Sequence, residues 1–150
     1  MDIALYQPEI PQNTGTIMRI CACFGSPLHI IHPSGFVLND RNLRRAGMDY
    51  ISLSHLTQHV SWSHFLESLQ KKRVILVTPH TSILYTDFEF HEDDILLFGS
   101  ESSGVPPTIH AQIDHKVKIP MVPECRSFNL AVSVGIVLSE ALRQTHRFPN

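Results

Sequence analysis

The chain has 150 residues, of which 43% are hydrophobic and 17% are charged, and its formal net charge is −2. This composition excludes a disordered chain, and the length predicts a single domain over residues 1–150 with one core. The sequence holds no apolar run of roughly 18 residues and no signal-peptide pattern at its start, so we expect a cytoplasmic protein with no membrane span. Binding to nucleic acid would need a local basic patch, because the overall charge is slightly acidic.

Alternation of short apolar runs with helical patterns predicts an α/β fold. Asn13 is expected to cap the first helix, and Gly25 to end it. The strand segments are apolar throughout, which is typical of a parallel sheet flanked by helices on both faces. The predicted elements in chain order are strand 3–6, helix 14–24, strand 28–31, helix 40–46, helix 62–71, strand 74–77, strand 95–98, strand 117–119 and helix 128–143.

The last predicted helix is apolar around its whole circumference, which indicates burial on nearly all sides. One side can pack on the sheet, and we expect the other to pack on a second subunit, with residues such as Val137 at the interface of a homodimer. Its apolar residues are Leu130, Val132, Val134, Ile136, Val137, Leu138, Ala141 and Leu142.

The cysteines and histidines do not predict a metal site. Three cysteines exclude a complete disulfide framework, and Cys21 and Cys23 do not share a face of the predicted helix. His55 and His59 have i,i+4 spacing but no glutamate between them, so the zinc-protease pattern is missing. We expect packed cysteines, surface or packing histidines, and no metal.

Three loops have unusual composition: residues 8–15, 98–106 and 119–130. Each alone has an ordinary explanation, such as helix caps or glycines in turns. Neither a Walker A motif, a dinucleotide-binding fingerprint nor a nucleophile elbow is present. The second and third loops follow predicted strands, and ligands of open α/β sheets bind at the carboxyl ends of strands, so a joint ligand site is plausible.

The same three loops resemble the motifs of the SPOUT superfamily of RNA methyltransferases. The first motif is Asn-Thr-Gly-Thr-Ile-Met-Arg at 13–19, the second is Leu-Phe-Gly-Ser-Glu at 97–101 with Gly-Val-Pro at 104–106, and the third is Ile-Pro-Met at 119–121 with Arg-Ser-Phe-Asn-Leu at 126–130. The short length and Leu-Arg-Arg-Ala-Gly-Met-Asp-Tyr at 43–50 are similar to the tRNA (cytidine/uridine-34-2′-O)-methyltransferase family, which modifies the wobble nucleotide.

The resemblance implies a parallel α/β sheet whose C-terminal part forms a deep trefoil knot, a homodimer, and tRNA bound through its anticodon region. It implies S-adenosylmethionine as the cofactor, held in the knot, with Gly99 close to the ligand. The residues expected at the cofactor are Val77, Thr78, Gly99, Glu101, Ile119, Met121, Ser127 and Leu130.

The resemblance also assigns Arg19 to the ribose hydroxyl. A guanidinium has a pKa above about 12 and is a poor base, so we expect Arg19 to orient the hydroxyl and stabilise developing negative charge. Asn13, Asn129 and Ser127 are expected to help position it. The candidate RNA-binding residues are Arg19, Arg41, Arg44, Arg45 and Arg126.

Two positions depart from the pattern of the family. Ser103 stands where relatives often have arginine, and Ser139 where they often have tyrosine, so details of tRNA contact are open. Two alternatives stay open beside the wobble-nucleotide enzyme. One is a SPOUT methyltransferase acting on another RNA, such as rRNA, and the other is a catalytically idle knot protein that binds RNA.

Overall fold

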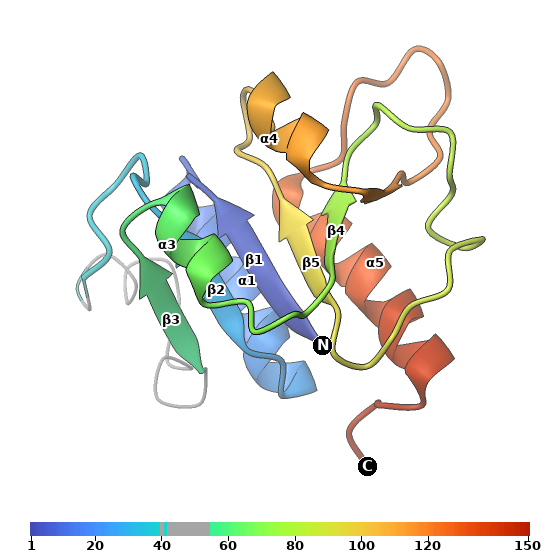
Figure 1. Ribbon diagram of the computed structural model, residues 1–150, viewed down its shortest axis with the longest axis horizontal. Helices are drawn as coiled ribbons and strands as arrows, with labels where there is room; N and C mark the ends of the chain where they lie inside the picture. The colour runs from blue at the N-terminus through green and yellow to red at the C-terminus, as the bar shows by residue number, and fades with distance from the viewer. Residues whose placement is uncertain (40, 42–54) are drawn as a thin grey trace.

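A six-stranded, all-parallel sheet forms the centre of the protein, with strand order β3-β2-β1-β5-β4-β6 (Figure 1). The computed structural model describes residues 1–39, 41 and 55–150. The predicted α/β class with a parallel sheet is confirmed. The elements are β1 (Asp2–Tyr6), α1 (Pro11–Phe24), β2 (Leu28–Ile31), β3 (Leu56–His59), α3 (Trp62–Glu67), β4 (Val74–Val77), β5 (Ile95–Phe98), α4 (Pro107–Gln112), β6 (His115–Val117) and α5 (Leu130–Thr145).

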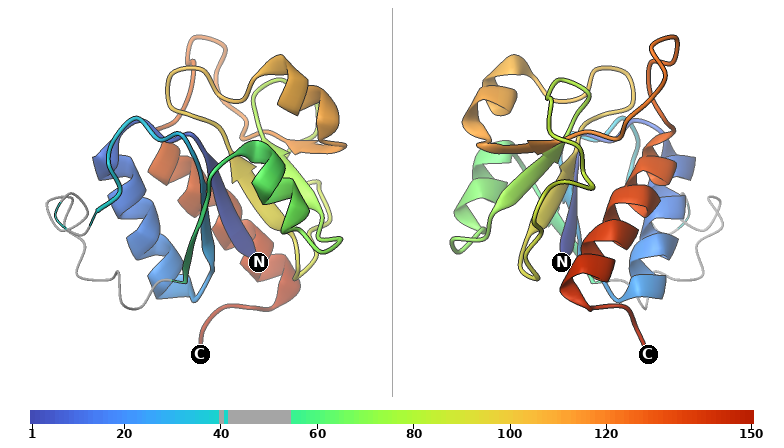
Figure 2. Two further views of the ribbon diagram at one scale, coloured as in Figure 1. Left: turned by 60° about the vertical axis from the view of Figure 1, so that its left-hand side comes forward. Right: turned by 90° about the vertical axis from the view of Figure 1, so that its right-hand side faces the viewer.

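Helices cover both faces of this sheet, as its apolar strands require. Helices α1 and α5 lie side by side on one face, and α3 and α4 lie on the other (Figure 2). Alternate residues of β1 point to opposite faces: Ile3 and Leu5 pack with α1 and α5, whereas Ala4 and Tyr6 pack with α3 and α4. Both cores are therefore built on the same central strand.

Helix α5 buries one face within its own chain, not its whole circumference. Val137 is fully buried in the core, so its predicted place at a subunit interface is wrong. Val132 is 48% exposed on the outer side. The residues of the buried face are Ala131, Val134, Val137, Leu138, Ala141 and Leu142.

The start of α1 differs from the prediction. The helix begins at Pro11, with Ile10 as an N-cap that offers no side-chain hydrogen bond, so the prediction that Asn13 caps it is wrong. Proline at the first helical position lacks an N–H that would have no partner there, and its φ already suits a helix. Asn13 is thereby placed inside the first turn, and its side chain is available for other contacts.

The remaining differences involve short or polar segments. The predicted helix 62–71 ends at Glu67, and Gln70 and Lys71 adopt left-handed φ values of 46° and 73°. The predicted strand 117–119 is His115–Val117, and β3 and α4 were not predicted. The predicted helix 40–46 lies outside the described residues except for Arg41. Within the described ranges, no helix has the length and apolar character needed to cross a membrane.

Candidate functional site

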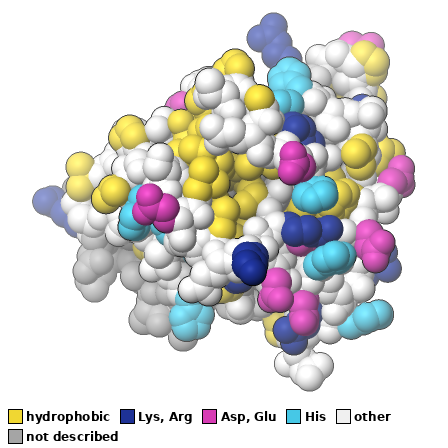
Figure 3. Space-filling model, in the orientation of Figure 1, with side chains coloured by type: hydrophobic (Ala, Val, Ile, Leu, Met, Phe, Trp, Pro, Cys, Tyr) yellow, Lys and Arg dark blue, Asp and Glu magenta, His cyan; other side chains and the backbone are white. Residues whose placement is uncertain are grey.

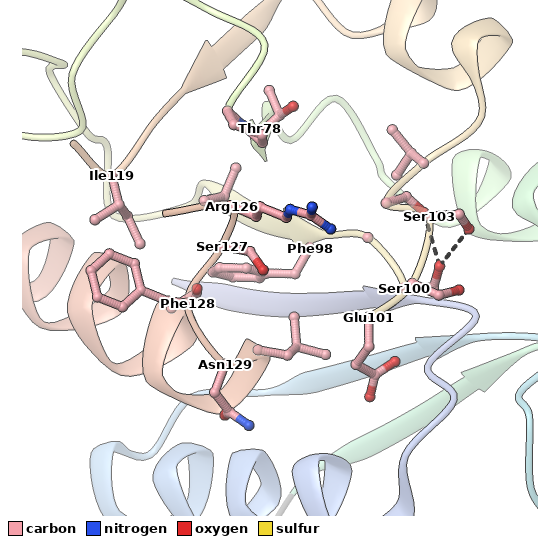
Figure 4. A pocket seen from close by; sticks show the side chains of 18 of the residues that line it. Thr78, Phe98, Ser100, Glu101, Ser103, Ile119, Arg126, Ser127, Phe128 and Asn129 are labelled. Carbon is pink, nitrogen blue, oxygen red and sulfur yellow. Dashed lines mark hydrogen bonds between the residues drawn. The ribbon is translucent and has the colours of Figure 1, made fainter. Parts of the chain in front are cut away.

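The unusual loops converge on one pocket at the carboxyl ends of β4, β5 and β6 (Figure 4). Its volume is about 680 Å³, within the range of pockets for cofactors and other small ligands. Thr78 directly follows β4, Gly99 directly follows β5, and the start of α5 closes the opposite side. All eight residues predicted at a cofactor lie around it: Val77, Thr78, Gly99, Glu101, Ile119, Met121, Ser127 and Leu130.

The pocket wall includes further residues that the sequence analysis missed. Pro79 and His80 extend the loop after β4, and their position after an apolar strand was a usable signal. His110 comes from α4, which was not predicted, so no signal pointed to it. Leu76 and Ser133 were missed as well, while the remaining lining residues lie in the three predicted loops without having been named as ligand contacts: Ile10, Phe98, Ser100, Ser102, Ser103, Gly104, Val105 and Phe128.

Glu101 joins the second loop to the start of α1. Its Oε2 accepts a hydrogen bond from the backbone N–H of Glu9 at 2.7 Å, and its Oε1 accepts one from the N–H of Ile10 at 3.1 Å. Oε1 also accepts from Asn13 Nδ2 at 3.3 Å. A carboxylate near a helix N-terminus is favoured by the helix dipole. The first turn of α1 has no acidic residue of its own, and Glu101 supplies the negative charge there. Of about four acceptor positions on a carboxylate, three are used and one stays open to a further donor.

Asn129 joins the third loop to the same group. Its Nδ2 donates to Asn13 Oδ1 at 2.8 Å, while its Oδ1 caps α5 by accepting from the N–H of Ala131 at 2.9 Å and of Val132 at 3.4 Å. Asn13 in turn donates to Glu101. Three side chains, one from each motif, thus form a continuous line of hydrogen bonds at the pocket.

The loop after β5 folds back on itself so tightly that Gly99 has no room for a side chain. A Cβ on Gly99 would lie 2.3 Å from the carbonyl carbon of Gly104. The backbones of Ser100 and Gly104 exchange two hydrogen bonds, and the hydroxyls of Ser100 and Ser103 lie 3.0 Å apart. The chain's own backbone therefore excludes a side chain at Gly99, in addition to its predicted closeness to a ligand.

Two histidines of the pocket wall, His80 and His110, lie near each other. His80 and His110 approach edge to face, with ring centroids 6.4 Å apart. Thr78 Oγ1 accepts from the N–H of His80 at 3.2 Å. The buried Nε2 of His110 has no hydrogen-bond partner within the described part of the chain. An orphaned polar atom in the wall of a pocket is suited to a ligand with its own donor or acceptor.

Of the three predicted RNA-binding arginines that the structure describes, only Arg126 lies in the pocket wall. Arg126 lines the pocket, and Figure 4 shows its side chain extending across it. Arg19 is exposed on α1 and Arg41 is exposed as well, and neither is among the lining residues. Arg44 and Arg45 lie outside the described residues. On the face drawn in Figure 3, basic, histidine and acidic side chains are interleaved instead of forming one basic patch.

Among the described residues, no group of three or more His, Cys, Asp or Glu side chains is arranged so that it could hold a metal ion. Burial raises the pKa of the Cys21 thiol to about 12, so this cysteine is a neutral core residue.

An all-parallel sheet with a pocket at its strand ends is the arrangement in which α/β proteins bind small ligands. Comparison with known proteins narrows this class. Residues 1–139 match the SpoU rRNA Methylase family, and the chain belongs to that family. This confirms the resemblance found in the three motifs.

Individual relatives match over nearly the whole chain. The chain is 51% identical to the tRNA (cytidine(34)-2′-O)-methyltransferase of Beijerinckia indica, covering 95% of this chain and 90% of the relative. It is 42% identical to the protein of the same name from Escherichia coli K12, covering 96% and 93%. A solved structure described as giving insights into the 2-OH methylation of C/U34 on tRNA superimposes with a TM-score of 0.91 at 44% identity, covering 95% of this chain and 94% of that one.

A more distant structure shares the fold alone. It is a SpoU methyltransferase from Streptomyces viridochromogenes in complex with the cofactor AdoMet, with a TM-score of 0.84 and 23% identity. The match covers 96% of this chain but only 57% of that chain.

Proposed function

We propose that this protein transfers the methyl group of S-adenosylmethionine to the ribose 2′-hydroxyl of the wobble nucleotide of tRNA, cytidine or uridine at position 34. The observation that carries the proposal is the line of hydrogen bonds Asn129–Asn13–Glu101 at the pocket, which unites the three motifs. Relatives named for this reaction match at 42–51% identity over nearly their whole length. The proposed substrate is the one in the names of these relatives.

The pocket has the properties that S-adenosylmethionine requires. Ile119, Met121 and Leu130 offer apolar surface for the adenine, while Thr78, Ser127 and the orphaned Nε2 of His110 offer polar contacts to the ribose and the amino-acid part. Glu101 has one acceptor position open to a donor. When bound, the cofactor supplies an electrophilic methyl group on a sulfonium.

The side chains of the protein hold the hydroxyl for the transfer. We assign Asn13 and Asn129 to positioning, because Asn13 is fixed by hydrogen bonds to Asn129 and Glu101, and Asn129 by its bonds to Asn13 and to the start of α5. Ser127 lies beside them in the pocket wall and offers a further hydrogen bond. For Arg19, which does not line the pocket of its own chain, we keep the role that the family resemblance implies, stabilising the negative charge that develops as the hydroxyl loses its proton. Arg126, which lines the pocket, contacts the RNA backbone.

The proposal includes a C-terminal trefoil knot and a homodimer, as the family resemblance implies. Exposed apolar residues support the dimer: Ile10 and Phe128 are each 42% exposed and Val132 is 48% exposed, and they adjoin the Asn13–Asn129 hydrogen bond in sequence. Such a surface gains stability when a second subunit covers it. We propose the anticodon region of tRNA as the part that contacts the dimer.

One experiment separates this function from its two alternatives. Purified protein is incubated with radiolabelled S-adenosylmethionine and with tRNA, rRNA or no RNA, and the labelled nucleosides are identified by mass spectrometry. A 2′-O-methylated nucleotide at position 34 is the expected product. Label in rRNA alone would indicate another RNA target, and cofactor binding without transfer would indicate an idle RNA-binding protein. Loss of the modification from the tRNA of cells lacking the gene is the matching observation in vivo.

A further inference from the structure

A second pocket adjoins the first across the loop that follows β5. It has a volume of about 330 Å³ and lies at the carboxyl ends of β1, β2 and β5. Ser100, Ser103 and Gly104 line both pockets, so this tight loop is a shared wall. A nucleotide whose ribose lies at the edge of this wall can present its 2′-hydroxyl to the first pocket and its base to the second.

The lining of the second pocket suits a neutral base and disfavours a phosphate. Pro33 and Pro106 provide flat apolar surfaces, and none of the described lining residues is a lysine or arginine. Among the described lining residues only Glu9 is charged, and its carboxylate accepts a hydrogen bond from Ser102 Oγ at 2.6 Å. Because no cation of the described lining offsets that negative charge, a phosphate group would be repelled.

Close backbone contacts between two loops fix the walls of this pocket. The N–H of Gly35 donates to the carbonyl of Pro8 at 2.8 Å, and a Cβ on Gly35 would lie 2.9 Å from Glu9 Cα. The loop after β2 is thus pressed against the loop after β1. A pre-formed cavity of this kind loses little entropy when a ligand enters.

Gln7, which lines this pocket, has an unusual backbone conformation. It directly follows β1 with a left-handed φ of 47°, a backbone conformation that is unfavourable for a non-glycine residue. Its N–H still donates to the carbonyl of Ile31 at 2.8 Å, so the ladder between β1 and β2 continues while the chain turns. Within the described residues its side-chain amide has no hydrogen-bond partner, although it lines the pocket.

We propose that the second pocket binds the pyrimidine base of the target nucleotide and that the Gln7 amide reads its Watson–Crick edge, an inference that rests on the proposed function. An amide carries both donors and acceptors. Turned one way it pairs with the amino group and the ring acceptor of cytosine, and turned the other way it pairs with the carbonyl and the ring N–H of uracil. RNA loops allow this, because unpaired bases can be splayed out and read on that edge. One side chain thereby accommodates both nucleotides.

The test changes the amide into an acceptor-only group. Gln7→Glu is compared with the wild type in single-turnover methylation of anticodon stem-loops that carry cytidine or uridine at position 34. Against cytosine a carboxylate accepts from the amino group but opposes the ring acceptor, and against uracil it accepts from the ring N–H but opposes the carbonyl. We therefore expect the rates of both substrates to fall about tenfold or more. Gln7→Asn, which tolerates a left-handed backbone but is one methylene shorter, should slow both substrates at least about fivefold.

Gln70 provides a matched control. It is also a glutamine with a left-handed φ, 46°, but it is exposed and precedes β4, at the opposite end of the sheet. Gln70→Glu should leave both rates and their ratio at wild-type values. Thermal unfolding and calorimetric binding of S-adenosylmethionine, expected to be unchanged in the Gln7 variants, show that fold and cofactor pocket survive.

The outcomes separate this inference from the proposed function. If the wild type methylates position 34 and both Gln7 variants keep the wild-type ratio and rates within about threefold, base reading by Gln7 is overturned while the proposed function stands. If the wild type methylates no nucleotide at position 34, both are overturned. A stem-loop without a base at position 34 adds a further check, because Gln7→Glu should not slow its reaction below that of the wild type.

Discussion

Asn129 donates a hydrogen bond of 2.8 Å from its Nδ2 to the Oδ1 of Asn13, a residue 116 positions earlier in the chain. The same Asn129 caps α5 through its Oδ1, and the same Asn13 donates to Glu101. The asparagine therefore has two separable roles, stabilising a helix and fixing a neighbouring side chain. A substitution that keeps one role and removes the other can tell them apart.

Asn129→Ala should lower the free energy of unfolding by about 1 kcal/mol, because the N-cap is lost. Asn129→Ser should restore most of that stability, since a serine hydroxyl also caps, but it cannot donate to Asn13. We expect both variants to transfer the methyl group at least about tenfold more slowly than the wild type. Urea unfolding measures the stability and a single-turnover assay measures the rate, both on the same preparations. Full transfer activity in Asn129→Ser would contradict the positioning role.

Two glycines offer a contrast between a closed and an open position. Gly99→Ala places a Cβ against the Gly104 backbone, so the loop at the pocket must shift, and S-adenosylmethionine should bind at least about tenfold more weakly. At Gly135 in α5 a Cβ meets only Ile20 Cδ1, at 3.9 Å, so Gly135→Ala should raise the free energy of unfolding by about 0.5–1 kcal/mol and leave cofactor binding unchanged. Calorimetry and thermal unfolding measure both effects. Unchanged affinity in Gly99→Ala would remove this loop from the cofactor site.

The central fold could be predicted because local pattern and tertiary environment agree there. Residues 74–77 and 95–98 are apolar runs, residues 28–31 are apolar except for His29, and each segment is a strand of the sheet. Strand β3 has the polar sequence Leu-Thr-Gln-His and lies at the edge of the sheet, where burial imposes no apolar pattern. Helix α4 has six residues and begins with proline, too short for a periodic signal.

The candidate site, too, could be predicted only in part from the sequence. Its residues could be placed on loops after strands and matched to a family, but their mutual contacts could not. Glu101 bonds to backbone groups 91 and 92 positions away, and nothing in the sequence near residue 101 signals that pairing. The expectation that Asn13 caps α1 was wrong because Pro11 starts the helix earlier. That shift of a few residues is what frees Asn13 for Glu101 and Asn129.

A histidine pair beside the sheet edge predicts sensitivity to acid. His29 Nδ1 and His59 Nε2 lie 2.9 Å apart, and His29 also faces Asp2 at 3.5 Å. Burial lowers the pKa of His59 below its ordinary value of 6.5, and the charges of His29 and His64 lower it further. The unfolded chain therefore takes up this proton more readily than the folded one, and stability is lost as the pH falls below 6.5.

His59→Gln should make the free energy of unfolding less dependent on pH between about pH 7.5 and about pH 5.5. Because the variant has no imidazole at position 59, its free energy of unfolding falls less with falling pH than that of the wild type, even if the variant is less stable at every pH. His55→Gln, at an exposed position just before β3, should keep the wild-type pH dependence. Urea unfolding at several pH values measures the slope, and an equal slope in His59→Gln and wild type would contradict the assignment.

Two valines on α5 separate folding from assembly. Val137 is buried in the core, so Val137→Asp should destabilise the chain by about 3 kcal/mol or more through an unpaired buried charge. Val132 is half exposed, so Val132→Asp should leave the fold intact and convert the proposed dimer into monomers. Light scattering and thermal unfolding distinguish the two outcomes. A wild-type protein that is monomeric at micromolar concentration would contradict the dimer.

Arg19 tests whether a charge acts in binding or in the reaction. The residue is exposed on α1, six positions after Asn13, and its proposed role is to stabilise charge that exists only in the transition state. Arg19→Ala should therefore lower the single-turnover rate at saturating tRNA about 100-fold or more while changing tRNA affinity little. Arg19→Lys should recover only part of the rate, because a lysine cannot form the paired hydrogen bonds of a guanidinium.

The control for Arg19 is Arg143, which is exposed near the far end of α5 and bonded to Glu140 at 2.8 Å. Arg143→Ala removes the same charge and should leave both rate and affinity unchanged.

Arg126→Ala is expected to weaken tRNA binding while the rate at saturating tRNA is retained. The slope of log affinity against log salt should fall by roughly 0.7 to 0.9, because one phosphate contact is lost. A parallel loss of phosphate contact is expected for Arg44→Ala and Arg45→Ala. If Arg19→Ala instead follows the Arg126 pattern, losing affinity and keeping its saturated rate, then Arg19 docks the RNA and the transition-state charge must be stabilised by another group.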